Sequence, residues 1–254
     1  MRKKAIWGSM IVALIIVCVA LSACMPKFSG GDAKITDDYK SSEVNAKIDA
    51  MRTNGGLRLV FKGIADADEG TDDVTYVYAA NGDLYYFSVD AEETYFDLSA
   101  DDHVVEYHKN ANEDWTKVVT YYDDSFTKED EKQNIRNSAE AVFNWMLFYD
   151  DEENTDSSGM AKETGEAIGR SCDKYSWGMS FLGVKVSYAC WIDKETGICL
   201  RWNTTTSAFG QGVDVNFECQ SFETNYTFGA MPEVSEEKTT YNNQPEQADG
   251  TVEE

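Results

Sequence analysis

"CWIDKETGICLRW" (residues 190–202) is the stretch that decides the expected fold of this chain. Two short apolar runs flank the turn DKETG (193–197), which is the pattern of a β-hairpin with a glycine-containing connection. The runs carry Trp191, Trp202, Cys190 and Cys199. The stretch could form a reactive or metal-binding site, a disulfide-linked hairpin, or two strands of a larger sheet.

Strands of the same kind extend on both sides of this hairpin. From about residue 167 the sequence predicts four strands, and between residues 57 and 122 it predicts about six more, separated by Gly, Asp and Asn clusters. Asn81-Gly82 separates two of these runs, and both residues accept the positive φ of a tight hairpin turn. The pattern indicates antiparallel pairing of consecutive strands.

Two helices are expected beside the strands. Residues 41–56 place Val44, Ile48 and Met51 on one helical face before Gly55-Gly56 ends the pattern. Residues 127–149 begin with a capping-box pattern, Thr127 and Asp130, and end in a run that is apolar on nearly all sides. Because loops are short and no low-complexity linker divides the chain, a single sheet is favoured over two domains.

The N-terminal residues resemble a bacterial lipoprotein signal. A basic start and a short apolar run lead to Leu21-Ser22-Ala23-Cys24, which resembles a lipobox. The resemblance implies cleavage before Cys24 and diacylation of its thiol; an uncleaved membrane anchor is the alternative. We expect a signal peptide (1–23), a lipidated tether (24–41), a folded domain (42–233) and a disordered acidic tail (234–254).

The chain is strongly acidic, with a net charge of −24. Cleavage of the signal would remove three basic residues and no acidic ones, which gives −27. Such a charge repels nucleic acids and anionic lipid headgroups. We therefore expect no nucleic-acid partner.

The sequence contains no recognisable catalytic or metal-binding constellation. His103 and His108 lie five residues apart on one expected strand, so they face opposite sides and cannot chelate one metal. The acidic loop at 66–73 fails the EF-hand pattern. We expect no catalytic residues, no metal, no cofactor and no enzymatic activity.

Four cysteines lie in the expected domain, at intervals of 18, 9 and 20 residues, which argues against a zinc site. Export would permit disulfides, and neighbouring strands allow the pairs 172–190, 190–199 and 199–219. Strict alternation places Cys199 on the opposite side from Cys190 and Cys219, so a bridge to it needs a bulge. We expect buried free thiols or one bridge between Cys172 and Cys190.

Several strands carry large apolar side chains on both faces, which indicates a sheet covered on both sides. Such a sheet could curl around the helices, hold a ligand, or form an ordinary sandwich core. If a cavity exists, the pattern favours the following lining residues: Tyr76, Tyr78, Tyr86, Val142, Trp145 and Met146.

Residues 42–233 resemble the LolA-like superfamily of bacterial lipoproteins. The short helix running into strands, the Gly169, Cys172 and Tyr175 region, and the Asp-x-x-Thr-Gly hairpin at 193–197 carry the resemblance. It also includes Trp191, Leu200 and Pro232. The resemblance implies an α+β fold, in which a single curved antiparallel sheet of about 10–11 strands forms an incomplete barrel with two or three helices against its concave face. Two departures are the apparent anchor at Cys24 and the four cysteines.

The resemblance implies a protein anchored at the extracytoplasmic face of the cell membrane through diacylglyceryl-Cys24. Such a protein would bind or shuttle a lipid or acyl chain in an apolar cavity. The alternative is a non-catalytic envelope module with a packed core and an acidic surface that docks a protein partner.

Overall fold

The computed structural model describes residues 41–67, 70–111, 113–140, 143, 161–181, 184–208 and 211–241. The predicted signal peptide, Cys24 and most of the predicted tether lie outside these residues, as do Val142, Trp145 and Met146. None of the helices in the described ranges combines the length and apolar character needed to span a membrane.

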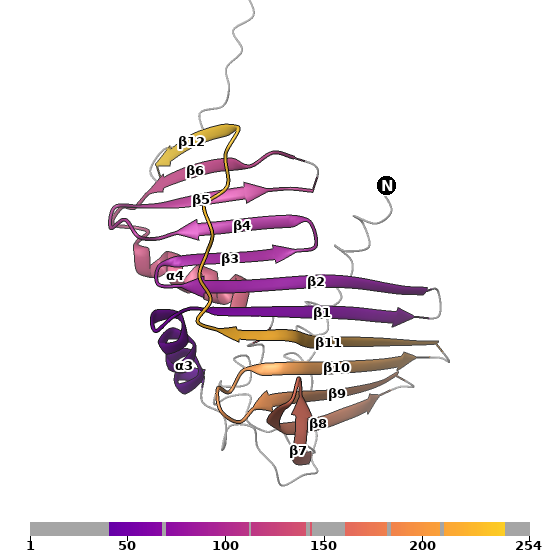
Figure 1. The fold of residues 1–254 in the computed structure, drawn as a ribbon. Helices are drawn as coiled ribbons and strands as arrows, with labels where there is room; N and C mark the ends of the chain where they lie inside the picture. Colours follow the sequence, from indigo (N-terminus) through magenta and orange to yellow (C-terminus); the bar gives the residue numbers. More distant parts are fainter. Residues whose placement is uncertain are drawn as a thin grey trace, which may run out of the picture. The chain divides into compact units, whose positions relative to one another are not determined.

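The described residues form helices α3 (Ser41–Thr53) and α4 (Lys128–Ile135), a π-helix η1 (Arg136–Glu140) and a set of β-strands. The strands are β1 (Leu57–Ala67), β2 (Gly70–Asn81), β3 (Leu84–Val89), β4 (Glu92–Asp97), β5 (His103–Lys109), β6 (Thr116–Tyr121), β7 (Ala161–Ala167), β8 (Arg170–Phe181), β9 (Val184–Asp193), β10 (Cys199–Ala208), β11 (Gln211–Thr224) and β12 (Glu236–Tyr241). Figure 1 labels each of them.

Hydrogen bonds join the described strands into one sheet of twelve, in the order β12-β6-β5-β4-β3-β2-β1-β11-β10-β9-β8-β7. Neighbours along the chain pair antiparallel from β3 to β6 and from β7 to β11, whereas β12 runs parallel to β6. The predicted single antiparallel sheet is therefore present, with one parallel strand added at its edge.

The chain folds as two compact units. Among the described residues, the first takes 41–50, 59–76, 143 and 161–222, and the second takes 51–58, 77–140 and 223–241, with the gaps given above. Strands β1 and β2 contribute residues to both. The core of each unit is apolar, with Ile48, Phe61, Ile198 and Leu200 fully buried in the first, and Tyr85 and Leu98 in the second.

The predicted α+β fold with two or three helices is wrong. In the described residues only α3, of 13 residues, and α4, of 8, are α-helices, so the strands dominate. The predicted second helix does begin at the capping box, where Asp130 N donates to Thr127 Oγ1 and Thr127 N donates to Asp130 Oδ2. After Ile135 the α-helical hydrogen-bond pattern gives way to that of the π-helix. The rest of the predicted helix lies almost wholly outside the described residues.

Two strands, β7 and β12, arise where the sequence predicted none. The turn between β7 and β8 consists of Ile168 and Gly169, with φ of 47° and 74°, the positive values of a type I′ hairpin. Residues Glu236–Tyr241 form β12, which corrects the disordered tail expected from residue 234. Its Thr239, Thr240 and Tyr241 are good strand formers, and the edge of β6 supplies their backbone partners.

Candidate functional site

One face of the first unit is lined by aromatic and β-branched side chains. In the β10–β11 register Trp202 lies opposite Phe217 and Thr204 opposite Val215, so these residues share a face. Phe217 stacks on Trp202 at 5.5 Å and on Phe61 at 5.2 Å between ring centroids. Together with Tyr76 and Val74, these residues form what we call the aromatic face: Phe61, Val74, Tyr76, Trp202, Val215 and Phe217.

The aromatic face continues across the neighbouring strands. Tyr188 lies opposite Thr204, and its ring stacks on that of Trp177 at 5.2 Å. Phe61 and Phe217 are almost fully buried, whereas Tyr76, Trp202 and Tyr188 are only half-buried. A sheet face that is simply solvated normally carries polar side chains, whereas this face exposes part of a row of large aromatic rings.

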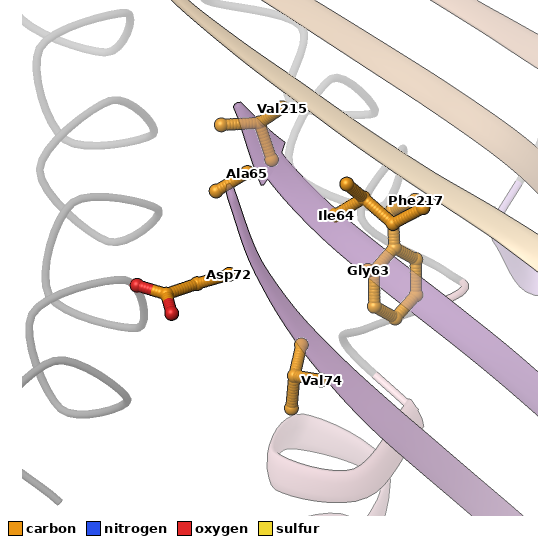
Figure 2. A pocket seen from close by; sticks show the side chains of 7 residues that line it. All are labelled: Gly63, Ile64, Ala65, Asp72, Val74, Val215 and Phe217. Atoms are coloured by element: carbon orange, nitrogen blue, oxygen red, sulfur yellow. The ribbon is translucent and has the colours of Figure 1, made fainter. Parts of the chain in front are cut away.

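A glycine creates a hollow in the aromatic face. A Cβ atom at Gly63 would lie 2.8 Å from Val74 Cγ1 and 2.9 Å from Phe217 Cδ2, so only glycine lets these two side chains close over β1. The hollow is shallow, with a cavity volume of about 10 Å³, and Figure 2 shows its walls. Its lining is Gly63, Ile64, Ala65, Asp72, Val74, Val215 and Phe217.

The predicted ligand residues do not all converge on this hollow. Tyr76 belongs to the aromatic face, where its ring meets Phe217 edge-on at 6.0 Å and burial raises its pKa. Tyr78, two residues along β2, belongs to the second unit, where its hydroxyl donates to Glu140 Oε1 at 2.6 Å. Burial, and then the charge of Glu140, raises the pKa of Tyr78 well above its ordinary value.

Tyr86 lies elsewhere. Its neighbour Tyr85 is buried and interacts electrostatically with Tyr78, so Tyr86, the next residue of β3, points to the opposite face. There its ring contacts that of Tyr95 at 4.5 Å, and its hydroxyl donates to Glu93 at 3.1 Å. The alternation of the strand alone could have separated Tyr86 from the other two tyrosines.

Phe143 is the described residue that the prediction for the apolar helix end missed. Its ring stacks on Phe61 with centroids 5.9 Å apart, its side chain is 1% exposed, and its carbonyl accepts a hydrogen bond from Cys199 N. The sequence places Phe143 in the same apolar run as the predicted residues, but helical spacing favoured its neighbours.

The Asp-x-x-Thr-Gly hairpin proves to be a structural motif. Asp193 is buried and accepts hydrogen bonds from Thr196 N and Oγ1, while Arg170 donates to both of its carboxylate oxygens. Burial acts to raise the pKa of Asp193, but the hydrogen bonds from Arg170 and Thr196 outweigh it and hold the pKa below its ordinary value. The hairpin at residues 190–202 therefore forms two strands of the sheet, and its buried Asp193 holds the turn together.

The four described cysteines are buried free thiols. Cys172 lies opposite Asp193 and Cys190 opposite Tyr175, so the two are three residue pairs apart, about 10 Å along the strands. That distance exceeds the ~7 Å between Cα atoms that a disulfide allows, which corrects the candidate bridge between Cys172 and Cys190. The register shifts between Cys199 and Arg201, so β10 does contain an irregularity at the position where a bridge to Cys199 would have needed a bulge, although Cys199 is a free thiol.

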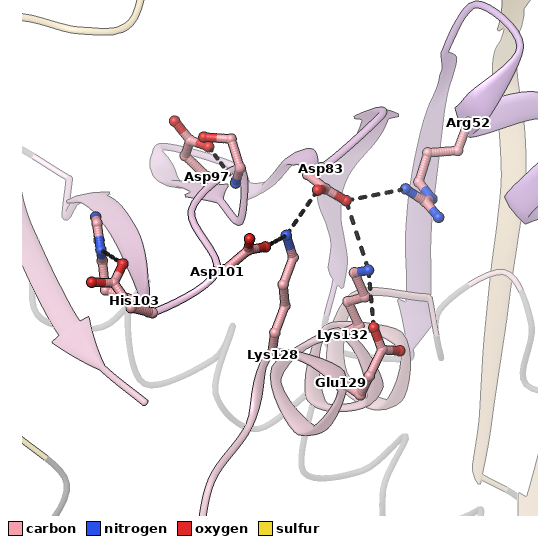
Figure 3. Close-up of polar contacts among 10 residues, drawn as sticks. Arg52, Asp83, Asp97, Asp101, His103, Lys128, Glu129 and Lys132 are labelled. Atoms are coloured by element: carbon pink, nitrogen blue, oxygen red, sulfur yellow. Dashed lines mark hydrogen bonds and ion pairs between the residues drawn. The ribbon is translucent and has the colours of Figure 1, made fainter. Parts of the chain in front are cut away.

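The polar clusters of the second unit link its elements to one another. Asp83, in the turn after Asn81-Gly82, lies 3.0 Å from Lys128 Nζ, 3.7 Å from Lys132 Nζ and 3.9 Å from Arg52 Nη1 (Figure 3). Arg52 also donates to the carbonyl of Gly82. These contacts join the β2–β3 turn to the ends of α3 and α4, so their function is structural.

The histidines and acidic groups likewise form local contacts. His103 Nδ1 lies 2.7 Å from Asp102, and His108 contacts Thr94 and Asn110. Within the described ranges no three His, Cys, Asp or Glu side chains gather in an arrangement that could hold a metal ion.

No family model matches the chain, and no curated protein matches its sequence. A solved DUF1329 family protein from Desulfovibrio piger is 8% identical, with 73% of this chain and 92% of that chain covered and a TM-score of 0.26. A domain described as an outer membrane lipoprotein-sorting protein, from Vibrio parahaemolyticus, is 8% identical over 74% and 93%, with a TM-score of 0.25. PNGF-II is 10% identical over 74% of this chain and 31% of its own, with a TM-score of 0.29.

The Vibrio parahaemolyticus domain is of the kind that the sequence resemblance indicates. TM-scores of 0.25 to 0.29 are nevertheless too low to establish a shared fold, so these likenesses do not assign the chain to a family.

Proposed function

We propose that this chain is a non-catalytic lipoprotein, anchored through Cys24 at the extracytoplasmic face of the membrane, that binds a hydrophobic ligand on its aromatic face. The observation that carries the proposal is the apolar hollow beside Gly63, bounded by Val74, Val215 and Phe217. Apart from Asp72, its lining offers no side chain that could hydrogen-bond or react with a ligand. Recognition there would depend on shape and on the burial of apolar surface.

The size of the hollow limits what it can hold. Binding sites for whole small molecules usually enclose ~300–1,000 Å³, whereas the hollow has a cavity volume of about 10 Å³. It could hold only the tip of an acyl chain, with the remainder lying along the half-buried rings of Tyr76 and Trp202. Each methylene taken out of water would contribute about 0.8 kcal/mol.

The test blocks the mouth of the hollow. Val74→Trp would place a large ring over it, whereas Thr75→Trp, one residue along β2, points to the opposite face and serves as the matched control. The chain from residue 25 to 254, secreted without its anchor, is examined by native mass spectrometry and by uptake of a fluorescent fatty acid. We expect a bound lipid in the natural chain and in Thr75→Trp, and its loss in Val74→Trp.

Two results would contradict the proposal. A natural chain without bound lipid and without fatty-acid uptake would mean a packed core, and the function would then lie in docking a protein partner. Equal binding by both tryptophan variants would place the ligand away from the hollow.

In that case, Trp145→Asp tests the apolar end of the predicted second helix, which the sequence predicted as part of the cavity.

A further inference from the structure

The C-terminal strand β12 is held to the second unit almost entirely by its backbone. It pairs with β6 in parallel register, from Glu236 opposite Thr116 to Tyr241 opposite Tyr121. The described side chains of β12 are all exposed, so they bury little apolar surface. Their contacts with β6 include a Lys117–Glu237 ion pair of 3.1 Å, a Thr120–Thr240 hydrogen bond of 2.8 Å and a hydrogen bond of 3.5 Å from Thr240 Oγ1 to the carbonyl of Val119. Exposed pairs of this kind add little stability.

Residues 225–235, which we call the strap, connect β11 to β12. Figure 1 shows the strap crossing β3, β4 and β5 before it reaches β6. Its first part is anchored: Asn225 N donates to the carbonyl of Gly56, and Asn81 Nδ2 donates to that of Tyr226. The ring of Phe228 then contacts Tyr95 at 6.1 Å.

The second part of the strap makes fewer ring contacts. A Cβ atom at Gly229 would meet nothing within 4 Å, whereas Met231 and Pro232 are half-buried, and the N and Oγ of the exposed Ser235 both donate to the carbonyl of Trp115. The aromatic anchor of the strap therefore ends at Phe228. Departure of β12 from the edge of β6 would break its own pairing and affect the Ser235–Trp115 contacts, but it would leave the contacts of Asn225, Tyr226 and Phe228 in place.

The edge beneath β12 has a composition that favours pairing. Strand β6 reads Thr116-Lys117-Val118-Val119-Thr120-Tyr121, in which all residues except Lys117 are β-branched or aromatic. It contains no proline and one charge. An uncovered edge strand of this kind presents free N–H and C=O groups, which are a template for another strand.

We infer that β12 is a removable cover, and that the edge it covers, Thr116–Tyr121, is a self-pairing surface for a second copy of this chain. Two β6 strands related by a two-fold axis pair antiparallel with Val118 opposite Val119. The same register sets Lys117 opposite Thr120 and Thr116 opposite Tyr121, so no like charges meet. Release of β12 exchanges the Lys117–Glu237 pair for this symmetric contact.

The experiment releases β12 in the chain from residue 25 to 254, which keeps every described element. Thr239→Pro with Thr240→Pro removes backbone donors from β12, and Glu237→Lys is a milder release that sets a lysine opposite Lys117. The matched control is Thr239→Val with Thr240→Val, which preserves strand propensity. We expect the mass measured by sedimentation equilibrium to double in both released variants and to stay monomeric in the control.

A second substitution tests the register. In the Thr239→Pro, Thr240→Pro variant, the further change Thr120→Lys sets a lysine opposite Lys117 of the second copy and should abolish the dimer. In the same variant, Thr120→Glu sets a glutamate opposite Lys117 and should lower the dissociation constant of the dimer by at least tenfold. Hydrogen exchange of β12 and near-ultraviolet circular dichroism verify release and folding. A folded, released chain that stays monomeric overturns the inference, and so does a dimer that is indifferent to Thr120→Lys.

Discussion

Three of the four buried thiols, those of Cys172, Cys190 and Cys219, lie in positions that oppose ionisation. Burial raises the pKa of Cys172 to about 11 and that of Cys219 to about 12, and it raises the pKa of Cys190 well above its ordinary value. The thiolate is the reactive form of cysteine, so at pH 8 these side chains should be inert. With a chromogenic disulfide reagent, we expect fewer than one thiol per chain to react in the native state of residues 25–254. All four should react in denaturant, and rapid native labelling of two or more would contradict their burial.

Asp193 should stabilise the fold as an ionised group. Removing it takes the buried acceptor away from Arg170, which keeps only the exposed Glu195, and from the Thr196 donors, so Asp193→Ala should cost about 2–3 kcal/mol of unfolding free energy. Because its pKa is lowered in the folded state, the stabilisation is present above the unfolded value, ~3.9, and is lost as pH falls through the folded value. Urea unfolding at pH 7 measures the loss. The control Glu195→Ala removes an exposed partner of Arg170 and should cost under ~0.5 kcal/mol.

The hairpin turn and α3 meet at a single tight contact. Gly197 has a φ of 79°, and a Cβ atom there would lie 2.5 Å from Val44 Cγ2 of α3. Gly197→Ala should therefore destabilise the chain by about 2 kcal/mol, through both the positive φ and the clash. The double variant with Val44→Ala relieves only the clash, so a thermodynamic cycle should show favourable coupling between the two sites. Strictly additive effects would mean that the backbone strain alone is responsible.

At the level of elements, the sequence predicts what local chemistry determines. Alternation predicted β1–β6 and β8–β11, and helical spacing predicted α3, whose Val44 and Ile48 are buried. The sequence patterns did not reveal β7 and β12, whose side chains are mostly exposed, because these strands form by pairing with a neighbouring strand edge and carry no apolar pattern. They did not reveal the π-helix either, because the spacing of apolar residues cannot distinguish α-helical from π-helical hydrogen bonding. At the candidate site, the sequence identified Tyr76. It could not identify Gly63, because the role of this glycine depends on which residues of the neighbouring strands lie beside it.

On the scale of the whole molecule, the acidic composition makes stability depend on pH in two opposite ways. Burial raises the pKa of Glu106 and of Glu131, and the charge of Glu106 adds to the effect on Glu131. A carboxyl group whose pKa is raised on folding binds more protons in the folded state, so stability falls as pH rises from the unfolded value, ~4.3, through the folded one. Repulsion within a chain of net charge −24 acts in the same direction. At low pH the lowered pKa of Asp193 reverses the trend.

These opposing trends predict a maximum of thermal stability near pH 5 for the chain from residue 25 to 254. Above it, Glu106→Gln should raise the Tm at pH 8 and leave the Tm at pH 5 almost unchanged, because glutamine removes a charge that is unfavourable only when ionised. The exposed Glu92→Gln is the control and should change neither value by more than about 1 °C. Added salt should raise the Tm at pH 8 more than at pH 5, because it screens the net repulsion. A Tm that climbs steadily from pH 5 to pH 8 would show that neither the buried glutamates nor the net charge limits the stability of the fold.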